Sequence, residues 1–122
     1  MTFKMLATVG AVICAALAIV WAFVPAVLLD LWSLDGSYPA VLIGRRGGAL
    51  FAGIAAMLWL ARDAGPSPAR SALGNGFVVG CGLLAASGLY ELAAGHAGPG
   101  ILAAVSVEVA LALAFLRYGR AA

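Results

Sequence analysis

Two adjacent arginines, Arg45 and Arg46, lie inside an apolar segment of this sequence. A charged side chain within a membrane-spanning segment is costly, and by default it marks a candidate functional site. The segment predicted to span the membrane is residues 39–61. A span that began after the arginines would keep only residues 47–61, fewer than the roughly 20 residues that a hydrocarbon core requires. The arginines are therefore predicted to lie within the span, about 9 Å from its first residue at a rise of about 1.5 Å per residue.

Two glutamates, Glu91 and Glu108, lie in the apolar segments that follow. If the spans alternate in direction, Arg45, Glu91 and Glu108 fall in the same half of the membrane, at depths of about 9, 5 and 12 Å. A buried charge needs an oppositely charged partner, so these residues predict one buried cluster. The cluster could fix which helices pack together, bind a ligand head group or a partner, or relay protons. A relay is the least favoured, because no acidic chain continues to the other side of the membrane.

The faces of the helix over residues 39–61 suggest where each arginine points. Arg45 shares one face with small residues: Ala49, Ala52, Gly53 and Ala56. Large residues lie on the opposite face: Leu50, Ile54, Met57 and Leu58. Small residues are typical of helix contacts in membranes, so Arg45 is predicted to point into the bundle. Arg46 lies at the boundary of the two faces and is predicted to extend its guanidinium toward the near membrane surface.

The remaining residues that could do chemistry give weaker signals. Cys14 and Cys81 each lie near the middle of an apolar run and form no CxxC motif. We interpret them as small buried thiols; a disulfide is the alternative if their helices are antiparallel neighbours. His96 lies in a loop with no second His or Cys nearby, which favours an exposed loop residue over a metal ligand. No catalytic residue and no metal site are predicted.

Four long apolar runs must position these residues. The chain is 65% hydrophobic and only 10% charged, whereas about a quarter of the residues in soluble proteins are charged. This pattern predicts an all-α fold, a single domain over residues 1–122 built as a four-transmembrane-helix bundle. The predicted spans are about 5–29, 39–61, 71–94 and 100–116. A formal charge of +2 without a basic run argues against a nucleic-acid partner.

The first run is interpreted as a span and not as a cleaved signal peptide, because its apolar core exceeds the 7–15 residues of a signal peptide and three more spans follow. Pro25 is expected to bend or end its helix, with an interfacial turn over residues 26–32. Basic residues near the span ends gather on one side: Lys4, Arg62, Arg70, Arg117 and Arg120. The positive-inside rule then predicts that both termini lie on the same side, in the cytoplasm.

Several short features resemble the DoxX-like superfamily of small four-helix bacterial membrane proteins over nearly the whole chain. They are an Ala/Leu-rich first helix ending at Val24-Pro25 and Leu28-Leu29, the sequence Arg45-Arg46-Gly47-Gly48, a short Arg/Pro loop, and Glu108 in the last helix. The resemblance implies a compact four-helix bundle and, for some relatives, an accessory role beside redox enzymes or the quinone pool. Such a protein is expected in the inner (cytoplasmic) membrane. The chain lacks a cysteine pair typical of thiol redox chemistry.

Two functions are compatible with these observations. The first is a non-catalytic accessory or assembly subunit that packs against a larger membrane complex or against copies of itself, because 16 glycines and many alanines provide helix contacts. The alternative is a site where Arg45, Arg46, Glu91 and Glu108 bind a lipid or a quinone; no other cofactor is expected. Solute transport is less favoured, because four helices rarely enclose a path and no inverted repeat is visible.

Overall fold

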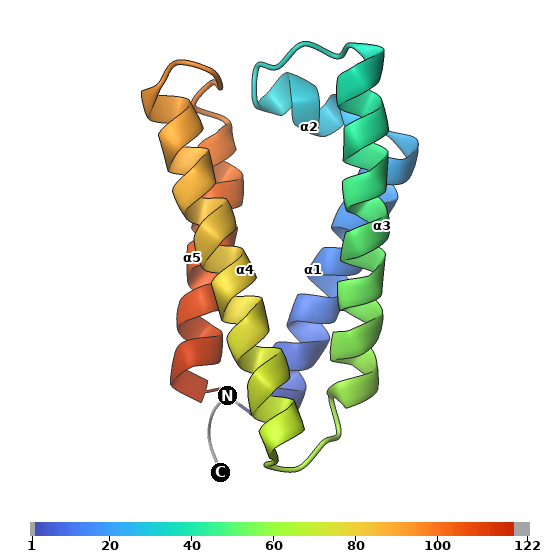
Figure 1. Ribbon diagram of the computed structural model, residues 1–122, viewed down its shortest axis with the longest axis vertical. Coiled ribbons are helices and arrows are strands. Elements are labelled where there is room, and N and C mark those ends of the chain that lie inside the picture. Colours follow the sequence, from blue (N-terminus) through green and yellow to red (C-terminus); the bar gives the residue numbers. More distant parts are fainter. Residues whose placement is uncertain (1, 119–122) are drawn as a thin grey trace.

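The computed structural model describes residues 2–118, and within this range every regular element is a helix. In chain order the helices are α1 (Phe3–Phe23), α2 (Pro25–Leu31), α3 (Tyr38–Ala61), α4 (Pro68–Ala93) and α5 (Ile101–Tyr118) (Figure 1). By length and composition, α1, α3, α4 and α5 can each cross a membrane. The prediction of an all-α fold is confirmed, and four long helices are apolar enough to be membrane spans, as predicted; the seven-residue α2 is an additional element.

The short helix α2 results from Pro25. A proline has no backbone N–H and is favoured at the first position of a helix, so α1 ends at Phe23 and α2 begins at Pro25. The segment predicted as an interfacial turn is therefore largely this helix. Its last turn leads into Trp32, whose ring packs on that of Trp21 of α1, with the ring centroids 5.7 Å apart. This contact folds α2 back against the end of α1.

The long helices pack as two pairs, α1 with α3 and α4 with α5 (Figure 1). Small residues allow each close approach. In the first pair, a Cβ added to Gly48 would lie 2.9 Å from the Cβ of Trp21 and 3.2 Å from the carbonyl oxygen of Ala18. In the second pair, a Cβ added to Gly88 would lie 2.8 Å from a methyl group of Val105.

The two pairs meet in an aromatic core at the beginning of α1 and the end of α5. The ring of Phe115 lies edge-on to that of Phe3, with centroids 6.4 Å apart, and 4.9 Å from the centroid of Phe77. Leu6 and Leu58 complete this core, each only 1% exposed. Because Phe3 and Phe115 are in contact, the start of α1 and the end of α5 lie at the same end of the molecule.

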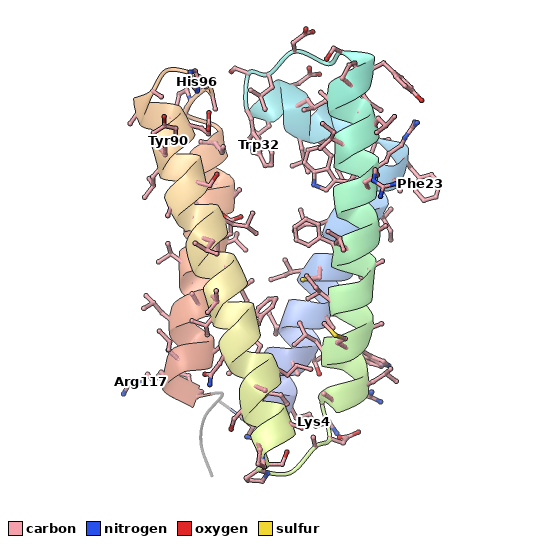
Figure 2. All side chains as sticks on the ribbon, in the orientation of Figure 1. Lys4, Phe23, Trp32, Tyr90, His96 and Arg117 are labelled. Atoms are coloured by element: carbon pink, nitrogen blue, oxygen red, sulfur yellow. The ribbon has the colours of Figure 1, made fainter. Side chains whose placement is uncertain are left out.

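At the opposite end, the pairs are joined through α2. The backbone N–H of Gly98, in the loop between α4 and α5, donates a hydrogen bond to the carbonyl oxygen of Trp32 at 2.8 Å. Figure 2 shows Trp32 and His96 at this end, with Lys4 and Arg117 at the other. From the aromatic core toward the α2 end the helix pairs diverge, and α2 lies between them where they are farthest apart (Figure 1).

Candidate functional site

A cleft of about 610 Å³ lies between the diverging helix pairs. All four long helices contribute to its walls, which consist almost entirely of apolar side chains. Met57 of α3 and Leu84 of α4 line the cleft and are 52% and 44% exposed. α3 and α4 each pack along their own partner helix, so the cleft opens sideways at these residues, onto the surface that would face lipid.

Glu108 is the one charged side chain among the described residues that line the cleft. It lies on α5, about 10 Å along the helix axis from Ile101, and is half-buried. No hydrogen bond or ion pair joins its carboxyl group to another residue within 2–118. A carboxyl group can accept hydrogen bonds in either protonation state and can donate one when neutral. Glu108 therefore offers hydrogen-bonding capacity that the described part of the chain leaves unused.

Cys14 and Cys81 also line the cleft, one from each helix pair. Both are free thiols, and they are only 3% and 6% exposed. The prediction of two small buried thiols is confirmed, and the alternative of a disulfide is not realised in this structure. Cys14, Cys81 and Glu108 all line the cleft, which therefore brings together two thiols and one carboxyl group. The position of each cysteine near the middle of an apolar run was the sequence signal that placed both thiols in the interior.

Arg45 and Arg46 are both exposed on α3. The prediction that Arg45 points into the bundle is wrong, because the face of α3 that packs on α1 is the one bearing Gly44 and Gly48. Arg45 lies about 100° around the helix from Gly44 and about 60° from Gly48, beside this contact face, and it is exposed. The small residues that share a face with Arg45 are exposed with it, whereas Leu58, predicted on the opposite face, is 1% exposed.

The predicted cluster of Arg45, Glu91 and Glu108 does not form. The carboxylate of Glu91 lies 2.8 Å from Nδ1 of His96 at the end of α4, Glu108 lies in the cleft, and Arg45 lies on the outer face of α3. Similar depth was a poor guide because α3 belongs to one helix pair, whereas α4 and α5 form the other. The four predicted site residues thus occupy three separate places: the cleft, the loop end of α4, and the exposed face of α3.

His96 is an exposed loop residue, as predicted, with a side chain 64% exposed. Within residues 2–118, no group of three or more His, Cys, Asp or Glu side chains is arranged to hold a metal ion.

The cleft has the size and the lining of a small-molecule site. Its volume of about 610 Å³ falls within the range of roughly 300–1,000 Å³ that is typical of small-molecule sites, and such sites usually combine apolar walls with few polar groups. Comparison with protein-family models, with curated proteins and with solved structures found no match to this chain.

Proposed function

We propose that this chain is an integral membrane protein that binds a small apolar molecule with one polar group, of the lipid or quinone class, in the cleft between its helix pairs. The observation that carries the proposal is a cleft of about 610 Å³ with apolar walls, one carboxyl group and a lateral opening. A ligand dissolved in the bilayer can enter between α3 and α4 without crossing water.

Glu108 gives the cleft its selectivity. Lipid tails are as apolar as the cleft walls, so moving an apolar group from the bilayer into the cleft gains little hydrophobic free energy. A hydrogen bond to Glu108 has no counterpart among acyl chains. The cleft should therefore favour molecules that bring a carbonyl or hydroxyl group to the depth of this carboxyl, as a quinone ring or an isoprenoid alcohol does.

We propose an orientation with both ends of the chain on the cytoplasmic side of the inner membrane. Lys4, Arg62, Arg70 and Arg117 lie at or near the ends of long helices, and basic residues near span ends are enriched on the cytoplasmic side. The pair of loops at the α2 end would then face outward.

The test is to measure binding of a short-chain quinone to the purified protein by native mass spectrometry, with a matched pair of variants. Gly80 lines the cleft and Gly82 does not, and a Cβ at either position meets nothing within 4 Å. Gly80→Leu should fill the cleft and abolish binding, whereas Gly82→Leu, the same change on the same helix, should leave it intact. Unchanged binding in Gly80→Leu would refute the proposed site.

The role of Glu108 is tested with the same probe. Glu108→Gln keeps the shape of the side chain and some hydrogen-bonding capacity, whereas Glu108→Leu removes it. Loss of one hydrogen bond should raise the dissociation constant by up to about tenfold. Equal affinity in Glu108→Leu and the parent protein would show that the carboxyl does not contact the ligand.

A second candidate is the accessory or assembly subunit, with the cleft receiving a helix of a partner. It is favoured by Gly76 and Gly80, four residues apart on the cleft wall of α4, both of which leave open space. Small residues at this spacing let transmembrane helices approach closely. Native mass spectrometry of the assembly after mild extraction separates the candidates: a stoichiometric protein lost in Gly80→Leu supports the subunit, and a bound small molecule supports the ligand site.

A further inference from the structure

Arg45 and Arg46 are the described cations without a partner in the protein. Lys4 pairs with Asp63 at 3.0 Å, and the guanidinium groups of Arg62, Arg70 and Arg117 lie over the rings of Trp59, Phe3 and Tyr118. Neither Arg45 nor Arg46 makes a hydrogen bond, an ion pair or a ring contact within residues 2–118. Both nevertheless lie on a helix that can span a membrane.

Their depth brings both guanidinium groups within reach of the membrane surface. The 24 residues of α3 extend about 36 Å, compared with about 30 Å for a hydrocarbon core. If α3 is centred in the bilayer, the Cα atom of Arg45 lies only about 7 Å below the hydrocarbon boundary. Tyr38, at the start of α3 and 69% exposed, is an aromatic residue of the kind enriched at membrane–water interfaces.

The direction of the side chains also favours this surface. In an α-helix every Cα–Cβ bond tilts toward the helix N-terminus, and the N-terminus of α3 is its nearer end for both arginines. Long basic side chains near span ends extend to the interface and leave their stems in the apolar layer. Both guanidinium groups can therefore extend toward the lipid phosphates of the leaflet at the α2 end.

We propose that Arg45 and Arg46 form a binding site for the phosphate group of an anionic membrane lipid, on the exposed face of α3. A planar guanidinium donates two parallel hydrogen bonds to phosphate, and two adjacent arginines about 100° apart around the helix can hold one phosphate from two sides. The small neighbours Gly47 and Ala49 leave room beside the helix for the head group. This site is separate from the cleft and does not depend on the function proposed for it.

The test is native mass spectrometry of the full chain extracted from vesicles that contain equal amounts of phosphatidylglycerol and phosphatidylcholine with the same acyl chains. The parent protein should retain phosphatidylglycerol in preference. Arg45→Gln with Arg46→Gln should reduce the ratio of retained lipids by about tenfold or more, the effect of losing a charge-assisted hydrogen bond. The control, Arg62→Gln with Arg117→Gln, removes two charges at the other end of the molecule and should keep the ratio.

Two further measurements complete this test, one with a second double variant and one with inorganic phosphate as a competitor. The double variant Arg45→Lys, Arg46→Lys preserves both positive charges, and it provides a folded protein if the glutamine variant does not accumulate. A weaker preference of this lysine variant for phosphatidylglycerol supports recognition by the guanidinium fork. Inorganic phosphate added before extraction should not displace the lipid. Three outcomes would each overturn the proposal. Free phosphate could displace the lipid, or the variants could lose a partner protein in place of a lipid. The third is a ratio of retained lipids that is unchanged in both the lysine and the glutamine variants.

Discussion

At the scale of single residues, the Lys4–Asp63 pair links the first turn of α1 to the loop that precedes α4. The hydrogen bond and the positive charge of Lys4 lower the pKa of Asp63 below its usual value of 3.8, with a smaller contribution from Arg62. Because the pKa of Asp63 is lower in the folded state, the pair contributes stability above the unfolded pKa. That contribution is lost as the pH falls through the folded pKa.

We therefore expect Lys4→Met to raise the pKa of Asp63 toward 3.8, and Lys4→Arg to keep it low. The measurement is the carboxyl carbon chemical shift of Asp63 as a function of pH in detergent micelles. The effect on stability should be small, because both side chains are more than 60% exposed. An Asp63 titration that is the same in Lys4→Met and the parent protein would contradict the pairing.

The two thiols give a second prediction at this scale. Cys14 and Cys81 are buried from water but line the cleft, so a reagent must enter from the bilayer to reach them. We expect a lipid-soluble maleimide to modify both thiols and a charged, membrane-impermeant one to modify neither, as followed by intact-protein mass spectrometry. Gly80→Leu should slow the reaction and Gly82→Leu should not; equal rates in the two variants would show that the cleft is not the route.

The sequence shows which polar residues lie in the membrane-spanning helices, but it does not show which of them come into contact. Glu108 and the cysteines are visible in the sequence because polar groups are rare in its apolar runs. Which groups meet depends on how helices pair, and depth alone does not specify the pairing. Arg45 and Glu108 have similar predicted depths yet lie in different places, because the chain pairs α1 with α3 and α4 with α5.

At the scale of elements, Gly48 determines how closely α3 approaches α1. A Cβ at this position would lie 2.9 Å from the Cβ of Trp21, which belongs to the stem of the ring and cannot move without shifting α1. Gly53, on the same helix, has nothing within 4 Å of the same added atom. Comparing the same substitution at Gly48 and at Gly53 therefore distinguishes the effect of close helix packing from the general effect of glycine on helix stability.

We expect Gly48→Ala to destabilise the protein by about 1–3 kcal/mol, the typical cost of overpacking. Gly53→Ala should be neutral or stabilise it by up to about 1 kcal/mol, because alanine is the better helix former. Equilibrium unfolding in mixed micelles measures both. Equal effects of the two substitutions would mean that the contact between α1 and α3 is looser than the structure has it.

The extent of each long helix was largely predictable, because polar or breaker-rich segments separate the apolar runs. The end of α1 followed from Pro25, since proline cannot continue a helix. The contact face of α3 was not predictable from the small-residue rule, because α3 carries two small faces. The one with Gly44 and Gly48 packs on α1, whereas the one with Ala52 and Ala56 stays exposed.

At the scale of the whole molecule, the cleft is a consequence of contacts at both ends of two tilted helix pairs. The aromatic core around Phe115 joins the pairs at one end, and the hydrogen bond from Gly98 to Trp32 joins them at the other. The cleft lies between these two contacts, where the helix pairs are apart. A volume of this kind depends on the tilt of whole helices, so no local sequence pattern could have predicted it.

The orientation of the molecule in the membrane would determine which leaflet supplies the lipid proposed for the arginine pair. Gly36 and Gly65 provide a matched test, because they lie in loops at opposite ends of the bundle and an added Cβ at either one meets nothing within 4 Å. In a Cys14→Ala, Cys81→Ala background, Gly36→Cys should react with an impermeant maleimide added to intact cells with a permeable outer envelope. Gly65→Cys should react only after the inner membrane is opened. The physical reason is that Lys4, Arg62 and Arg70 lie near the Gly65 end, and basic residues there resist translocation. The reverse labelling pattern would place Arg45 and Arg46 in the cytoplasmic leaflet, where the same phosphate chemistry would apply to a different pool of lipids.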